Sequence, residues 1–205
     1  MKIKEDYICP KCQHKNRIKL FSEVTGDNIS KIIDKSIFIH TCKNCGERIS
    51  VEYPLTVVKE NYKIHFTPND NSDLPICDAK VNRVCDTYAD LKEKILILED
   101  NLDDIVIEEL KAQIKKNLGD LDIKDLGSLE TIRYNSKDNI NLNFSLVGIG
   151  KLVGVSIGEY QNLKNSIKIK SINNSVLIDE YTYKKYIRRC SYEIASKKRF
   201  RFFKW

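Results

Sequence analysis

The chain has 205 residues, of which 41% are hydrophobic and 31% are charged, and its formal net charge is +6. This length and apolar content support a buried core, in one sizeable domain or in two small ones. No run of about 18 apolar residues occurs and the N-terminus has no apolar signal-peptide stretch, so we expect neither a membrane span nor a secretion signal.

The charge is distributed unevenly along the chain. Residues 1–70 hold 12 basic and 9 acidic side chains, residues 71–127 hold 8 and 14, and residues 128–205 hold 15 and 6. Seven basic residues lie within residues 188–205, against the single acidic residue Glu193. An electrostatic partner is therefore expected first at the C-terminal end.

Two cysteine pairs near the N-terminus have the same internal spacing. They are Cys9-Pro10-Lys11-Cys12 and Cys42-Lys43-Asn44-Cys45. Two intervening residues let a tight turn aim both thiolates at one point, and two such turns supply four sulfur ligands for a tetrahedral Zn²⁺. The 29 residues between the pairs suit a zinc ribbon with a strand or two between its turns. The sequence therefore predicts one structural zinc ion, held by Cys9, Cys12, Cys42 and Cys45.

Two other interpretations of these cysteines remain open. Disulfide or redox chemistry would need an oxidising compartment, for which the sequence gives no sign. A site of three cysteines and one histidine would use His14 or His40 in place of a sulfur. The remaining cysteines, Cys77, Cys85 and Cys190, are expected to be small buried residues or free thiols. This cysteine usage favours a cytoplasmic protein.

Alternating apolar residues predict a β-rich first domain. The expected strands cover residues 17–24, 36–41, 48–53 and 62–66, with turn chemistry at 25–28 and a short helical turn from Ile29 to Ile33. A polar stretch at residues 67–73 is the expected boundary. We therefore predict a zinc-ribbon domain over residues 1–70 and a second, α+β domain over residues 71–205.

A helical period follows this boundary. Thr87 and Asp90 resemble a capping box, Asn101 and Asp104 are a second candidate cap, and Gly119 is a plausible stop. We predict two helices within residues 88–117, with a single kinked helix as the alternative. The carboxylates of this region are expected to be helix caps and solvated surface, since no spacing ties them to a histidine or lysine. They are Asp100, Asp103, Asp104, Glu108 and Glu109.

The strand period returns after Gly127. Residues 139–147 alternate most cleanly, and residues 151–157 and 166–172 continue the pattern. The glycines between 148 and 158 loosely resemble a phosphate loop, but the residues after Gly150 favour a strand, so we expect hairpin turns. A last helix is expected at residues 180–196. The predicted fold class is α+β: a β-rich zinc ribbon, then two central helices, an antiparallel sheet and a C-terminal helix.

The C-terminal tail combines basic and aromatic residues. Its cations can neutralise phosphates while aromatic rings stack on unpaired bases. The alternation of Phe200 and Phe202 with basic residues also suits a strand with one buried edge, and we favour packing over free exposure. A membrane surface or an acidic protein is a further alternative. The candidate nucleic-acid contacts are Lys197, Lys198, Arg199, Arg201, Lys204 and Trp205.

The first part of the chain resembles the bacterial CpXC-domain family. The resemblance rests on residues 8–12, 38–46 and 51–55, and on the helical segment from Leu91 to Glu108; the C-terminal half resembles the family only loosely. It implies the four-cysteine site and a bacterial cytosolic origin, and it implies no enzyme activity. Gln13 stands where such a turn often has glycine, so we expect slight strain there.

Three functions are compatible with the sequence. We favour a zinc-stapled protein-interaction or scaffold module, with an unknown protein partner or self-association, because zinc ribbons often serve as structural staples. A nucleic-acid-binding protein using the basic aromatic C-terminus comes second. An enzyme of unknown reaction comes third, because four cysteines leave a zinc ion no open position for water.

Overall fold

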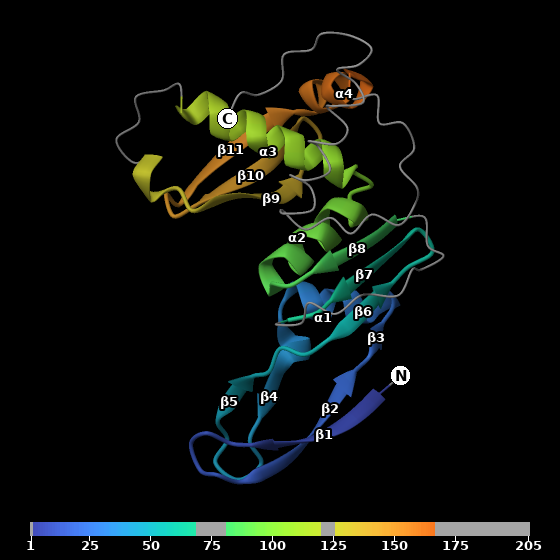
Figure 1. Ribbon diagram of the computed structural model, residues 1–205, viewed down its shortest axis with the longest axis vertical. Helices are drawn as coiled ribbons and strands as arrows, with labels where there is room; N and C mark the ends of the chain where they lie inside the picture. The colour runs from blue at the N-terminus through green and yellow to red at the C-terminus, as the bar shows by residue number, and fades with distance from the viewer. Residues whose placement is uncertain (1, 69–80, 120–125, 167–205) are drawn as a thin grey trace, which may run out of the picture. The chain divides into compact units, whose positions relative to one another are not determined.

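The computed structural model describes residues 2–68, 81–119 and 126–166 (Figure 1). These residues divide into two compact units, one ending at Lys92 and one beginning at Glu93. The fold class is α+β, as predicted, with α-helices and several small sheets. The expected domain boundary between residues 70 and 71 lies outside the described residues and stays a prediction.

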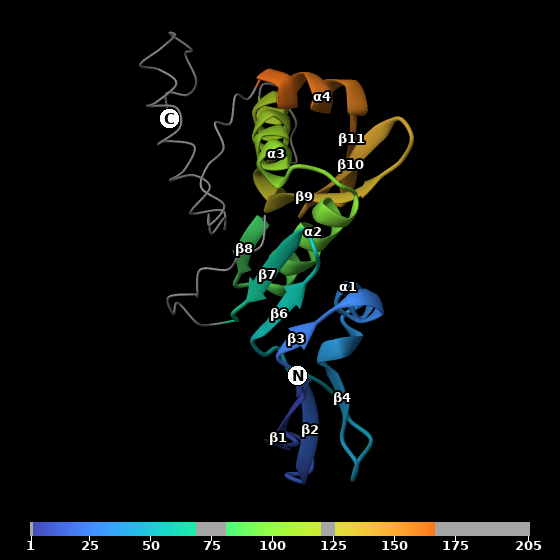
Figure 2. The same cartoon turned by 90° about the vertical axis from the view of Figure 1, so that its right-hand side faces the viewer.

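The first unit contains two antiparallel hairpins, whose four strands are labelled in Figure 1 and of which Figure 2 gives a second view. Strand β1 (Lys2–Ile8) pairs with β2 (Lys15–Phe21), and β4 (Ile39–Thr41) pairs with β5 (Arg48–Ser50). The loop of the first hairpin carries Cys9 and Cys12, and the loop of the second carries Cys42 and Cys45. Both cysteine pairs therefore lie at hairpin ends.

A four-stranded sheet completes the strands of this unit. Its order is β3 (Glu23–Val24), β6 (Leu55–Val58), β7 (Tyr62–Phe66) and β8 (Val81–Cys85). The β6–β7 pair is antiparallel, whereas β3–β6 and β7–β8 are parallel. Between β3 and β4 the chain forms two 3₁₀ turns, Gly26–Ile29 and Ser36–Phe38, and the short helix α1 (Ser30–Ile33).

Phe38 is the centre of the apolar packing in the first unit. It is fully buried and makes edge-to-face contacts with Tyr53, Phe66 and Tyr88, at centroid distances of 5.3, 5.6 and 5.9 Å. Such ring pairs contribute beyond the area they bury, by about 0.5–1.5 kcal/mol each. This aromatic cluster connects the segment before β4 with β7 and with the start of helix α2 (Tyr88–Glu99).

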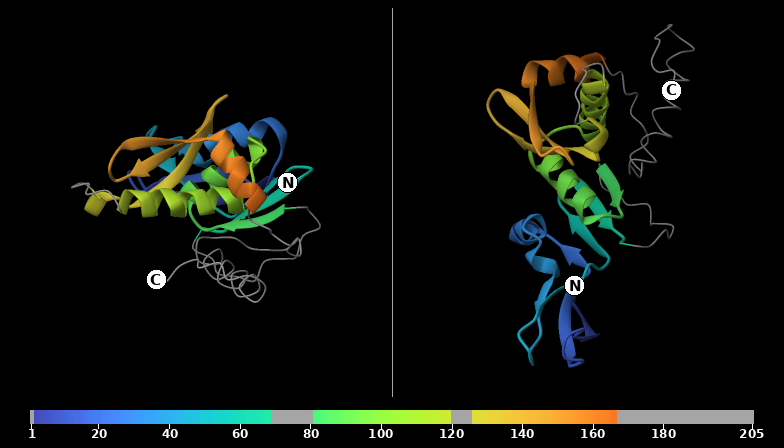
Figure 3. Two further views of the ribbon diagram at one scale, coloured as in Figure 1. Left: turned by 90° about the horizontal axis from the view of Figure 1, so that it is seen from above. Right: turned by 90° about the vertical axis from the view of Figure 1, so that its left-hand side faces the viewer.

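The second unit packs helices against an antiparallel sheet (Figure 3). It contains the rest of α2, then α3 (Asp104–Gly119), a 3₁₀ turn at Leu126–Ser128 and α4 (Ile157–Ser166). The sheet order is β11 (Lys151–Ser156), β10 (Asn141–Val147) and β9 (Thr131–Lys137). Leu142, Phe144 and Leu146 of β10 alternate inward and pack in one core with residues of α3 and α4.

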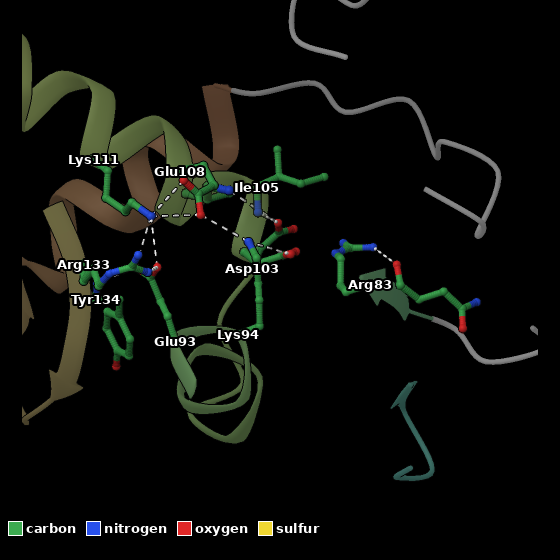
Figure 4. A network of polar contacts seen from close by, with 12 residues as sticks. Arg83, Glu93, Lys94, Asp103, Ile105, Glu108, Lys111, Arg133 and Tyr134 are labelled. Atoms are coloured by element: carbon green, nitrogen blue, oxygen red, sulfur yellow. Dashed lines mark hydrogen bonds and ion pairs between the residues drawn. The ribbon is translucent and has the colours of Figure 1, made fainter. Parts of the chain in front are cut away.

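A network of buried ion pairs joins α2, α3 and β9 in this unit (Figure 4). Glu93 accepts hydrogen bonds from Lys111, from Arg133 and from the backbone amide of Tyr134. Lys94 contacts Asp104 at 3.3 Å and Glu108 at 3.1 Å, and Lys111 contacts Glu108 at 2.9 Å. Three carboxylates face three cations, so each buried charge has an opposite charge beside it.

The acidic residues of this region were expected to be helix caps or solvated surface. This is correct for Asp103 and wrong for Asp104 and Glu108. Asp103 caps α3, since its carboxylate accepts the backbone amides of Ile105 and Val106. The expected cap at Asn101 with Asp104 is wrong, because Asp104 is 2% exposed and pairs with Lys94 instead. Glu108 is likewise part of the buried network rather than solvated surface. Lys94 comes from α2, which sequence spacing does not reveal, whereas Lys111 lies three residues after Glu108 on α3.

The second unit is expected to lose stability in acid. Burial opposes ionisation of Glu108, but the charges of Lys94 and Lys111 outweigh it and lower the pKa of Glu108 below the ordinary 4.5. Protonation therefore favours the unfolded state: this contribution is complete above pH about 4.5 and disappears as the pH falls through the lower, folded-state pKa. Urea unfolding of this unit at several pH values between 2.5 and 6 should show the loss, and Glu108→Gln should flatten it. A wild-type pH profile identical to that of Glu108→Gln would contradict the assignment.

Most elements predicted from the period are confirmed. Strand β7 and the two-helix interpretation match, and the Thr87–Asp90 capping box is present, with the Asp90 amide 3.1 Å from the Thr87 hydroxyl. Strands β1, β6, β8 and β9 and helix α4 were not predicted, and the expected strand at residues 36–41 is wrong over Ser36–Phe38, which form a 3₁₀ turn. The strand expected from residue 166 and the helix at 180–196 lie, beyond Ser166, outside the described residues.

Candidate metal centre

The two cysteine turns have the same backbone hydrogen bonds. In the first, the amide of Cys9 donates to the carbonyl of His14 and the amide of Gln13 donates to the carbonyl of Cys9, both at 2.9 Å. In the second, Cys42 donates to Glu47 at 2.8 Å and Gly46 donates to Cys42 at 3.0 Å. Each turn thus folds its two cysteines toward the same side, as the two-residue spacing predicts.

The fifth residue of each turn has a left-handed backbone. Gly46 has φ +72°, which glycine adopts without steric cost. Gln13 has φ +58° at the corresponding position, a conformation that costs about 1–2 kcal/mol for a residue with a Cβ atom. This agrees with the strain expected at Gln13.

The four sulfur atoms gather at one point. All four lie within 4.8 Å of one another, with Cys9 to Cys45 and Cys12 to Cys42 both at 3.7 Å. A tetrahedral ion with bonds of about 2.3 Å to sulfur places its ligands about 3.8 Å apart. The four cysteines can therefore hold one metal ion. Cys9 and Cys42 are buried, whereas Cys12 and Cys45 are partly exposed.

Asn16 connects the two turns and was not predicted from the sequence. Its side chain is buried, donates to the carbonyl of His14 at 3.0 Å and accepts the amide of Lys43 at 2.9 Å. Its amide nitrogen is also 3.4 Å from the sulfur of Cys42. One side chain thus contacts both turns and one sulfur. The only sequence signal is a polar residue at an inward position of β2.

Hydrogen bonds from the turns favour the thiolate form of two cysteines. The backbone of Cys45 and the side chain of Asn16 lower the pKa of Cys42 to about 6, against the effect of burial. The side chain of Asn44 and the backbone of His14 lower the pKa of Cys12. At Cys45 the backbone of Glu47 acts in the same direction, but burial and the other sulfurs outweigh it and raise the pKa to about 12. The surrounding hydrogen-bond donors therefore favour the thiolate form at Cys12 and Cys42 but not at Cys45.

Neither candidate histidine belongs to the sulfur cluster. The group that could hold a metal contains the four cysteines alone. The imidazole of His14 is exposed, and its carbonyl is used by Cys9. His40 lies on β4, where burial lowers its pKa and its Nε2 atom has no hydrogen-bond partner among the described residues. The geometry therefore favours four sulfurs over three sulfurs and a histidine.

Replacing Asn16 by alanine is expected to weaken metal binding by about 10–100-fold, the usual cost of losing a group that orients a ligand. The lost amide leaves the Lys43 N–H and the Cys42 sulfur without their partner. Competition with a chromophoric chelator measures the affinity. The control is Asn28→Ala, since the side chain of Asn28 accepts a hydrogen bond from the exposed Lys31 and belongs to the 3₁₀ turn Gly26–Ile29 rather than to a cysteine turn. Equal affinities of the two variants would contradict the role of Asn16.

Several predicted features cannot be placed. Cys77, Cys190 and the candidate nucleic-acid contacts from Lys197 to Trp205 lie outside the described residues. Cys85 is buried in β8, as expected for a small apolar residue. Among the described residues, no helix combines the length and apolar character of a membrane span.

A family comparison agrees with this site. The model of the CpXC protein family matches residues 8–111, which cover both cysteine turns, α2 and the first half of α3. This chain belongs to the CpXC family. No curated protein and no solved structure shows a significant match to this CpXC protein. The match contains all four clustered cysteines and Asn16.

Proposed function

We propose that this CpXC protein is a zinc-stapled interaction or scaffold module of the cytoplasm, in which Cys9, Cys12, Cys42 and Cys45 hold one structural Zn²⁺. The observation that carries the proposal is the convergence of four sulfurs at tetrahedral spacing. Four thiolates suit zinc or iron among tetrahedral sites, and a lone ion of either kind is coordinatively closed. We choose zinc because the ion is proposed to have only a structural role.

The metal has a clear structural task in these hairpins. The apolar cluster around the cysteines contains only Cys9, Cys42 and Ile49 as buried members. Isolated two-stranded hairpins are marginal in water, and so small a core adds little. A bound ion would join the β1–β2 and β4–β5 loops, and its binding free energy would become folding free energy.

The same closure speaks against a catalytic role for the ion. Catalytic zinc keeps one position for water or substrate, whereas four cysteine ligands leave none. The nearby hydrogen bonds also serve the turns, since Asn16 and the backbone donors hold sulfurs and loops in place. These features support a protein-binding surface whose fold is stabilised by a metal ion. A cytoplasmic location is proposed because thiol ligands persist in a reducing compartment.

The interaction role can be tested on the zinc-loaded full chain. We expect either self-association in sedimentation experiments or a protein that remains bound after nuclease treatment. Cys42→Ala should abolish this association, while Cys85→Ala, which removes a buried thiol outside the cluster, should preserve it. A monomer whose only co-purifying material is nuclease-sensitive would contradict an interaction module and support the nucleic-acid alternative.

A further inference from the structure

The outer face of the β1–β2 hairpin carries a row of cations. Strand residues two apart share a face, so Lys15, Arg17 and Lys19 of β2 all point outward, as their exposure confirms. The antiparallel register places Lys4 opposite Lys19 on the same face. We call these four residues, Lys4, Lys15, Arg17 and Lys19, the basic face.

A single acid offsets these four cations. Asp6 lies opposite Arg17 and pairs with Lys15 at 2.9 Å and with Arg17 at 3.6 Å. All three side chains remain largely exposed, at 44% for Asp6, 68% for Lys15 and 70% for Arg17. Exposed pairs of this kind contribute little to stability and can exchange partners.

A contribution to folding stability does not explain why Lys4 and Lys19 occupy this face. Both are exposed and directly opposite, and no ion pair links either lysine to a described residue. Like charges at facing positions of a sheet destabilise it. The β2 side chains on the opposite face, Asn16, Ile18 and Leu20, are buried, so β2 presents its cations in one direction; Glu5, opposite Ile18, is an exposed acid on the other face.

We infer that the basic face binds the phosphate backbone of duplex nucleic acid without reading its sequence. The three cations of β2 repeat about every 6.8 Å along an extended strand, and such a regular row suits a regular row of anions. Among the described outer residues of the hairpin, β2 carries one aromatic ring, the half-buried Phe21 at its end, and no series of exposed rings on which successive unpaired bases could stack. Duplex phosphates therefore fit better than single strands. The four residues of the basic face are neither metal ligands nor part of the C-terminal tail sequence.

The test uses the zinc-loaded full chain and a random-sequence DNA duplex of about 20 base pairs. Each phosphate contact contributes about 0.9 to the slope of log affinity against log salt. Lys4→Ser with Lys19→Ser should lower the slope by about 1.8 and the affinity by about 60-fold at 0.1 M salt. The C-terminal tail has the same sequence in the wild-type protein and in this variant. The difference between their salt slopes therefore measures the contribution of the hairpin.

Two variants control for charge and folding. Lys115→Ser with Lys116→Ser removes the same charge from exposed positions near the end of α3 and should leave the slope unchanged. Lys4→Arg with Lys19→Arg keeps the cations and should retain the affinity. The zinc content should be the same in all proteins.

Three results would overturn the inference. One is an equal loss of affinity in the hairpin and helix variants. Another is duplex binding that only substitutions among Lys197, Lys198 and Arg199 reduce. The third is failure to bind the duplex together with Lys4- and Lys19-dependent binding of poly-glutamate, which would assign an acidic polypeptide to this face.

Discussion

Cys42→Ala is expected to reduce bound zinc from one ion per chain to almost none and to unfold the two cysteine hairpins. Apparent free energies of structural zinc binding are about 10–16 kcal/mol, far above what two short hairpins hold by themselves. Cys42 is buried, receives hydrogen bonds from Asn16 and its own turn, and lies 3.7 Å from the sulfur of Cys12. Its loss removes one ligand and exposes the others.

Elemental analysis measures the metal, and amide hydrogen exchange of β2 and β5 measures the folding. Cys85→Ala is the matched control: it should keep one zinc ion and lose only about 1 kcal/mol, because it shortens one buried side chain. Full zinc content in Cys42→Ala would refute the four-cysteine site. Binding of one iron ion in place of zinc would refute the proposed identity of the metal but not that of its ligands.

Glu93→Ala is expected to destabilise the second unit by about 3–5 kcal/mol, the usual cost of removing one partner from a buried ion pair. Glu93 is 4% exposed and its carboxylate serves Lys111, Arg133 and the amide of Tyr134 at the same time (Figure 4). Without it, Lys111 keeps its ion pair with Glu108 alone, and the amide of Tyr134 in β9 loses the Glu93 carboxylate as its acceptor.

Urea unfolding of the zinc-loaded protein, followed by hydrogen exchange of β10, measures this loss. Glu109→Ala is the control, since Glu109 lies on α3 next to Glu108, is only half-buried and accepts a long 3.4 Å bond from Gln113. It should cost less than about 1 kcal/mol. Glu93→Ala with Lys111→Ala should recover part of the loss, because the double variant leaves fewer unpaired charges. Equal stabilities of the Glu93 and Glu109 variants would contradict the network.

Local sequence patterns predicted the structure correctly wherever a short segment determines its own conformation. The two-residue cysteine spacing predicted that both turns would aim their sulfurs inward, because the turn itself determines where two side chains three positions apart can point. The Thr87–Asp90 cap depends on neighbouring residues alone, so it was also predictable. The α+β class followed from the change of period.

Only the tertiary structure decided which distant residues meet. Nothing near Asn16 in the sequence indicates that it holds Lys43 of the other turn, and nothing near Glu108 indicates that Lys94 neutralises it. The parallel pairing of β7 with β8 likewise brings together two strands that no local sequence pattern connects. The sequence by itself determined the turns, the periods and the candidate ligands, because these are local; contacts between segments, and hence burial and charge pairing, required the folded chain.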